Sequence, residues 1–162
     1  MRKDLKYKIL LCLLAGSVLS VNTALATEYT ETVKEDITLN SGDIVSVDDV
    51  GIDSSDKELT VTVNGEASIH AENMSNDVIG INIENNNMLI NGDDDNAKLN
   101  VTANGGEKAT GIDIGGQIQN EVVINPDLEI TVSNNLNSSS QYDGAYGIDA
   151  YSNTKFNGDI NI

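Results

Sequence analysis

The segments "VIGINI" at 78–83, "ATGIDI" at 109–114 and "AYGIDA" at 145–150 share one pattern. Each contains a Gly-Ile pair, then an acid or an amide, then a second apolar residue. Successive side chains of an extended chain point to opposite faces, so the two apolar residues that flank the acid or amide share one face. The pattern therefore predicts three equivalent strands, each with a buried apolar face and an exposed polar residue.

A second element recurs between these strands. An apolar residue, Asn, Gly or Pro, and an acid follow one another at 63–66, 90–93, 124–127 and 156–159. Alternating β-branched segments such as "ELTVTVNG" at 58–65 are typical of half-buried strands and argue against a disordered chain. The two elements interleave with a period of about thirty residues, which is typical of a solenoid whose units stack on one another. We therefore expect an all-β, parallel β-solenoid of three to four coils.

The stacked coils give each recurring residue a structural role. Ile81, Ile112 and Ile148 are expected to form one inward stack, with Asp113 facing water. The glycine before each of these isoleucines indicates either a positive φ or a close approach of two backbones, and the pattern leaves both open. The recurring asparagines are expected to form side-chain ladders between coils.

Residues 1–26 are typical of an export signal. Basic residues precede an apolar run at 9–19, and Ala24-Leu25-Ala26 supplies the small residues that a signal peptidase accepts. We predict cleavage after Ala26, so that Thr27 becomes the first residue. The apolar run is too short to span a bilayer as a stable helix, and a buried N-terminal helix is the less favoured alternative.

Removal of the signal leaves a strongly acidic chain. It keeps five lysines against 25 acidic residues, a formal net charge of −20, and has no arginine. Nucleic acid and anionic membrane surfaces are excluded as partners, because both are bound through Lys and Arg. The only cysteine, Cys12, leaves with the signal, so disulfides are excluded as well.

Two features of the sequence suggest metal chemistry, and both have a simpler explanation. His70 is the only histidine and lies between two apolar residues, so it is expected to face outward on a strand. A catalytic or zinc role needs further ligands, and no second histidine or cysteine supplies them. Asp93-Asp94-Asp95 could bind calcium, but the segment lacks the glycine and distal glutamate of known calcium loops, which favours a solvated turn.

Two further groups of residues bear on sugar chemistry. Tyr142, Tyr146 and Tyr151 cluster around one coil, where they either form a sugar-stacking patch or pack a corner; both alternatives stay open. Asp113 and Asp149 are expected on adjacent coils, near the separation of about 5 to 9.5 Å that the two carboxylates of glycosidases require. The sequence as a whole predicts no catalytic, cofactor-binding or metal-binding residue, and no cofactor.

The export signal followed by acidic, cysteine-free coils rich in Asn, Gly and Asp resembles the N-terminal part of a type V autotransporter passenger, a right-handed parallel β-helix. The resemblance covers residues 1–26 as the signal and residues 51–162 as degenerate repeats, with 27–50 as an N-terminal cap or first incomplete coil. It implies a C-terminal β-barrel that carries the passenger across the outer membrane. No barrel pattern occurs up to Ile162, so we expect a truncated fragment whose only membrane contact would be through that missing barrel.

Two classes of function are expected. The first is an exported protein of a Gram-negative bacterium that is secreted or associated with the outer membrane at the cell surface. It would act in adhesion or self-association, with a host or neighbouring-cell surface protein or glycan as partner. The alternative is a polysaccharide lyase or hydrolase, since many enzymes share the β-helix. The absence of arginine from the mature chain disfavours an acidic-sugar lyase, and the prediction is a protein that is not an enzyme.

Overall fold

A computed structural model describes residues 25–84, 87–93, 95–116, 121–135 and 144–162. All regular structure in these residues is β-strand, and every strand pairing is parallel. The strands are β1 (Glu28–Tyr29), β2 (Ile37–Asn40), β3 (Ile44–Val47), β4 (Val50–Asp53), β5 (Leu59–Asn64), β6 (Glu66–Asn73), β7 (Val78–Glu84), β8 (Met88–Gly92), β9 (Lys98–Gly105), β10 (Lys108–Gly115), β11 (Val122–Ile124), β12 (Asp127–Asn134), β13 (Gly144–Ala150), β14 (Thr154–Phe156) and β15 (Ile160–Asn161).

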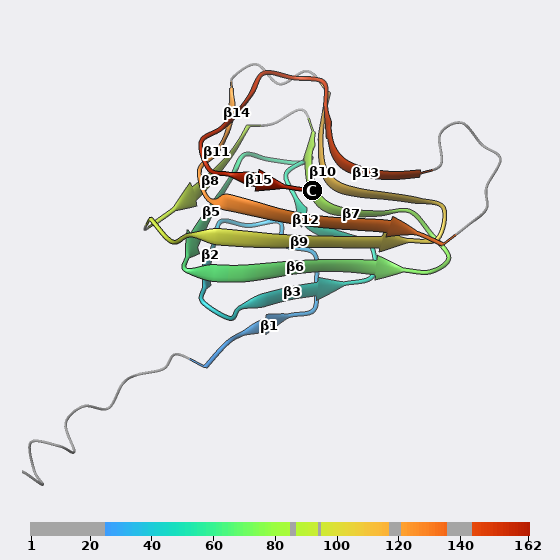
Figure 1. The fold of residues 1–162 in the computed structure, drawn as a ribbon, viewed down its shortest axis with the longest axis horizontal. Helices are drawn as coiled ribbons and strands as arrows, with labels where there is room; N and C mark the ends of the chain where they lie inside the picture. Colours follow the sequence, from blue (N-terminus) through green and yellow to red (C-terminus); the bar gives the residue numbers. More distant parts are fainter. Residues whose placement is uncertain (1–24, 85–86, 94, 117–120, 136–143) are drawn as a thin grey trace, which may run out of the picture.

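The strands form three sheets, and the chain visits each sheet in turn. Sheet A has the order β1-β3-β6-β9-β12-β15, sheet B the order β4-β7-β10-β13, and sheet C the order β2-β5-β8-β11-β14. Figure 1 shows the strands of sheet A stacked one above another from β1 to β15. Every third strand is a neighbour in space, so the chain completes four to five coils. The predicted all-β parallel solenoid is confirmed, but it has more than the three to four coils predicted, because β1, β2 and β3 also pair with the stacked strands.

The core is built from inward residues that repeat from coil to coil. In sheet B, Ile52, Ile81, Ile112 and Ile148 lie in register on adjacent strands. The first three have no exposed surface, and Ile148 is partly buried against the same core. The predicted inward stack of isoleucines is confirmed. Each stacked side chain fills the space between its neighbours above and below, so water is excluded along the axis.

The glycine before each stacked isoleucine is required by a close approach. Positive φ values among the described glycines occur at other positions. A Cβ on Gly80 would lie 2.4 Å from Val101 Cγ1 in sheet A and 2.6 Å from the carbonyl oxygen of Gly111 in the next coil. Gly80 and Ile81 are both buried, so the alternation of faces is interrupted there. Sheets A and B therefore meet tightly at a row of glycines.

The predicted asparagine ladder forms in two segments. Asn64 Nδ2 donates to Asn40 Oδ1 at 3.3 Å. Asn125 Nδ2 donates to Asn91 Oδ1 at 3.0 Å, and Asn157 Nδ2 donates to Asn125 Oδ1 at 2.7 Å. Asn64 Oδ1 is buried without a hydrogen-bond partner among the described residues, which marks the end of the first segment.

The break in the ladder has a cause in the register. The motif at 90–93 was predicted to be equivalent to the motif at 63–66, and this prediction is wrong. Ile90 pairs with Val61, so the two motifs lie two residues out of register. The strand of sheet A in this coil starts only at Lys98, after a longer corner. Pairing of inward apolar residues sets the register of a strand, and a local motif does not override it.

Candidate binding surface

The outer face of sheet B carries one row of polar side chains, which we call the acidic row. It consists of Asp53, Asn82, Asp113 and Asp149, which lie in register on β4, β7, β10 and β13. Neighbouring strands lie about 4.8 Å apart, so these side chains are within reach of one another. The Gly-Ile repeat places them there, since each follows a stacked isoleucine by one residue.

At its N-terminal end the acidic row is held by internal partners. Asp53 Oδ1 accepts hydrogen bonds from Asn82 Nδ2 and the Ser55 amide, each at 3.0 Å. Lys34 Nζ lies 3.1 Å from Asp53 Oδ2. Burial alone would favour the neutral acid, but the hydrogen bonds outweigh it and lower the pKa of Asp53. This end of the row is therefore ionised and already paired.

The middle of the acidic row is different. Burial raises the pKa of Asp113; the nearby charge of Lys108 opposes this shift, and the negative charges of Asp149 and Glu84 add to it. Lys108 Nζ lies 4.0 Å from Asp113 Oδ2 and 5.3 Å from the centre of the Tyr146 ring. Asp113 therefore keeps its proton at a higher pH than an ordinary aspartate.

Two of the three candidate tyrosines flank this part of the row. Tyr146 is partly buried on β13, whereas Tyr151 is 77% exposed just beyond β13. The Tyr151 hydroxyl lies 3.5 Å from Asp149 Oδ2, and the negative charge of Asp149 raises the pKa of Tyr151. Tyr142 lies outside the described residues. We call Lys108, Tyr146, Asp149 and Tyr151 together with Asp113 the tyrosine patch.

The other sequence candidates are not brought into a cluster. His70 is exposed on β6 and lies in register with Ser46 and Thr102, so its predicted outward orientation is confirmed. Asp93 and Asp95 are exposed, and Asp94 is outside the described residues. Within the described part of the chain, no group of three or more His, Cys, Asp or Glu side chains is placed to hold a metal ion.

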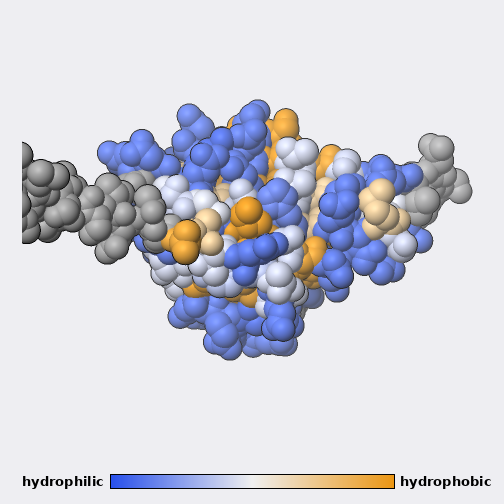
Figure 2. Space-filling model, turned by 90° about the horizontal axis from the view of Figure 1, so that it is seen from below, coloured by the Kyte–Doolittle hydropathy of each residue, from blue (hydrophilic) through white to orange (hydrophobic). Residues whose placement is uncertain are grey.

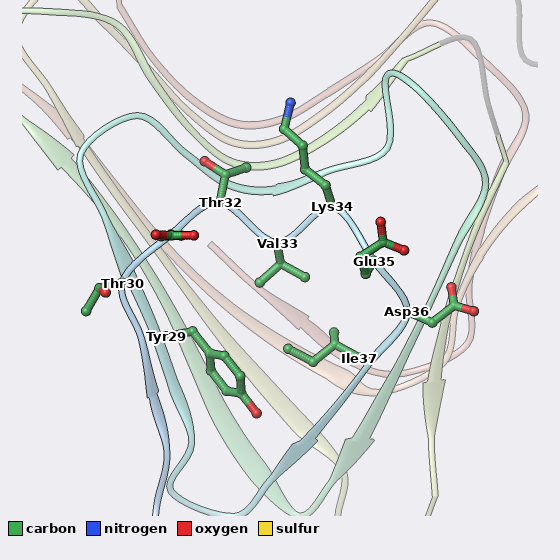
Figure 3. Close-up of a pocket in the computed structure, with 9 residues that line it drawn as sticks. Tyr29, Thr30, Thr32, Val33, Lys34, Glu35, Asp36 and Ile37 are labelled. Atoms are coloured by element: carbon green, nitrogen blue, oxygen red, sulfur yellow. The ribbon is translucent and has the colours of Figure 1, made fainter.

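An open hollow of about 490 Å³ lies at the N-terminal end of the solenoid and was not predicted. Residues 29–37 line it, and Figure 3 shows Tyr29, Val33 and Ile37 pointing into it, whereas Thr32, Lys34 and Asp36 point away. Figure 2 shows hydrophobic residues interspersed among hydrophilic ones on this end of the molecule. Tyr29, Val33 and Ile37 are spaced four positions apart, and this spacing was the sequence signal for the hollow.

The structure also contains one buried acid that the sequence patterns did not predict. Asp43 is only 2% exposed, and its carboxylate accepts hydrogen bonds from the backbone amides of Asn40 at 2.8 Å and Thr27 at 2.6 Å. The segment Leu39-Asn40-Ser41-Gly42-Asp43 is one residue longer than the recurring Asn-Gly-acid motif. Allowing that extra residue would have identified it as an earlier corner of the same kind.

The predicted cleavage bond, between Ala26 and Thr27, lies next to this acid, since the Thr27 amide donates to Asp43 Oδ1. Ala24 is outside the described residues, Ala26 and Thr27 are exposed, and β1 begins directly afterwards. In the described part of the chain no helix has the length and apolar character needed to cross a membrane. Comparison with protein-family models, with curated proteins and with solved structures gives no significant match to this chain.

Proposed function

We propose that the chain is an exported cell-surface protein that acts by binding, in adhesion or self-association, as the N-terminal part of a passenger of the autotransporter kind. Three observations support this proposal. Residues 1–26 have the order of an export signal, the strands form a parallel solenoid, and the mature chain is strongly acidic. The observation that carries the binding role is the tyrosine patch on the outer face of sheet B.

The tyrosine patch has the chemistry of a surface for glycans or proteins. An exposed aromatic ring stacks on the apolar face of a sugar or packs against a protein side chain, and a carboxylate accepts hydrogen bonds from hydroxyl groups. Tyr151 supplies the exposed ring, and Asp149 supplies a carboxylate beside it. Asp149 lies on β13, and Tyr151, which follows this strand, donates its backbone amide to the Ile114 carbonyl at 2.8 Å. Such positioning lowers the entropy lost on binding.

A binding experiment tests this role. The processed chain would be applied to whole cells, immobilised extracellular proteins and a glycan array. Tyr151→Ala and Asp149→Asn are each expected to weaken binding by about tenfold, the range of a central contact residue. Thr131→Ala is the control, because Thr131 is also exposed but lies on the outer face of sheet A. Equal binding by all three variants would contradict a role for the tyrosine patch.

Export is tested separately by the start of the mature chain. Mass spectrometry of protein recovered from the periplasm, outer membrane or medium is expected to show Thr27 as the first residue. Full-length protein that remains in the cytoplasm would contradict export while leaving the binding experiment valid.

The second candidate function is a carbohydrate-active hydrolase. Asp113 and Asp149 lie side by side in register, and the raised pKa of Asp113 suits a general acid beside a second carboxyl group. Retaining glycosidases use carboxyl groups about 5 to 5.5 Å apart. Release of reducing sugar from a panel of polysaccharides, lost in both Asp113→Asn and Asp149→Asn, would favour catalysis. Binding without any product would favour adhesion.

A further inference from the structure

The first observation is that a buried carboxylate stands where the solenoid places apolar side chains. Among the described residues, Asp43 is the only ionisable side chain in the buried class. It occupies the position just before Ile44, which pairs with Ser68, so the equivalent residue in the next coil is Ala67. The coil after that has Leu99 at this position. A buried carboxylate is costly unless an opposite charge or several hydrogen bonds compensate it.

The second observation is that its partners in the full-length chain are neutral. Asp43 Oδ2 accepts hydrogen bonds from the Asn40 amide at 2.8 Å and from Asn40 Nδ2 at 3.4 Å. Oδ1 accepts one from the Thr27 amide at 2.6 Å. Each ion pair found among the described residues joins a lysine to an acid other than Asp43. The carboxylate therefore has hydrogen bonds but no cationic side chain beside it.

The third observation is that its closest donor is the atom that processing would change. Cleavage after Ala26 adds water across the Ala26–Thr27 peptide bond: Ala26 leaves with a carboxylate, and the Thr27 nitrogen becomes an α-amine. An α-amine has a pKa of about 7.7 to 8.0, so it is an ammonium at neutral pH. The backbone around Thr27 is already fixed, because Ile44 N donates to the Thr27 carbonyl at 2.9 Å and Glu28 pairs with Ile44.

We propose that removal of the export signal creates the missing counter-charge, and that the new α-ammonium of Thr27 forms an ion pair with the buried carboxylate of Asp43. The inference rests on the proposed export only for the position of the cleavage. The ion pair fastens β1 to β3 at the end of sheet A. In the precursor the Thr27 nitrogen is a neutral amide that donates to the same carboxylate, so its first coil is less stable until the signal has been removed.

A double-mutant cycle tests the ion pair without relying on export. Chains that begin at Thr27 would be released from an N-terminal fusion, with the α-amine either free or acetylated, and with Asp43 or Asn at position 43. Acetylation keeps an N–H donor at the Thr27 nitrogen and removes its charge. An ammonium donor holds a carboxylate more tightly than a neutral amide donor does, by about a factor of ten in equilibrium constant.

In the Asp43 chain, we expect acetylation to lower the equilibrium constant for folding, measured in urea, by about tenfold. In the Asp43→Asn chain we expect a change below about twofold. An equal effect of acetylation in both backgrounds would overturn the ion pair. A mature chain that starts at another residue, found by mass spectrometry, would overturn the processing step instead, so the two failures are distinguishable.

A second measurement applies if the Asp43→Asn chain does not fold. The rate at which an acylating reagent modifies the free α-amine of the Asp43 chain would be compared with the rate for an unstructured peptide of the sequence Thr27-Glu28-Tyr29. An ammonium held by a buried carboxylate should react at least about tenfold more slowly, because only the neutral amine is nucleophilic. Equal rates would overturn the proposal.

Discussion

Replacing Gly111 by alanine is expected to destabilise the solenoid strongly, although the substitution adds a single methyl group. A Cβ at this position would lie 2.5 Å from the carbonyl oxygen of Gly147 and 2.5 Å from Ile130 Cγ2. The oxygen belongs to the backbone of the next coil, and Ile130 is buried in sheet A. Neither neighbour can move aside without shifting a paired strand.

The size of the effect follows from these two contacts. Inserting a methyl group into a packed core costs about 1 to 3 kcal/mol, and two rigid neighbours place Gly111→Ala at the upper end. The alanine also reduces the conformational entropy of the unfolded chain, which stabilises the folded state by about 0.4 to 1 kcal/mol. We therefore expect a net loss of about 2 to 2.5 kcal/mol in the free energy of unfolding.

Gly115 provides the matched control on the same strand. Its φ is not positive, and the nearest atom to an added Cβ is Asp113 Oδ1 at 3.7 Å, an ordinary contact. Gly115→Ala should therefore be neutral or stabilise the protein by up to about 1 kcal/mol. Urea unfolding followed by far-ultraviolet circular dichroism measures both variants, with expected midpoints about 1 to 2 M apart. If the two midpoints agree within error, the close approach of sheets A and B at the glycine row is refuted.

Three further perturbations probe the core, the acidic row and the net charge. Ile112→Asp should cost more than about 3 kcal/mol by burying an unpaired charge, whereas Asp113→Asn should be silent or slightly stabilising near neutral pH; equal protease resistance of the two would contradict the inward stack. Because the pKa of Asp53 is lowered in the folded state, its contribution to stability is present above its unfolded pKa and is lost as the pH falls through the folded value. Asp53→Asn should therefore lower the urea midpoint at pH 7, and this loss should become smaller as the pH falls through the acidic range. A loss that does not change with pH would show that the charge of Asp53 is irrelevant. In residues 27–162, Ile160 and Ile162 are exposed, and the last strands have no further neighbour among the described residues, so we expect self-association through this edge. Salt screens the charge of −20 that opposes it, so light scattering should increase with salt. Scattering that does not depend on salt would count against self-association.

Much of the fold was predictable from the sequence because each coil of a solenoid repeats the same alternation of buried apolar and exposed polar residues. The isoleucines of the Gly-Ile strands were assigned to the core from alternation alone, and the structure buries Ile81, Ile83, Ile112 and Ile114 completely. Alternation is reliable here because each strand has one face toward the core and one toward water. The same pattern placed Asp113 on the outer face.

The predictions that were wrong or left open depended on contacts between segments far apart in the chain, which a local sequence pattern does not specify. The corner at 90–93 matched the expected motif, but its register depends on which inward residues meet in the neighbouring coil, and Ile90 meets Val61. The choice between a positive φ and a close approach for the recurring glycine required the position of a residue from another sheet, such as Ile130 beside Gly111. The burial of Asp43 likewise depends on chain segments that lie 16 residues apart, since its nearest donor is the Thr27 amide.

The parallel stacking of coils also determines how the molecule would respond to tension. Hydrogen bonds between coils run along the solenoid axis, so a pull on the two ends loads them one strand pair at a time. Equivalent residues of adjacent coils, such as Ile81 and Ile112, are 31 positions apart in the chain but neighbours in the sheet. A stacked coil adds about 4.8 Å to the length of the solenoid, whereas the same coil, once detached and stretched, spans roughly 100 Å. A rod of this construction would lengthen in steps under load and so limit the force that reaches whatever it holds at its far end.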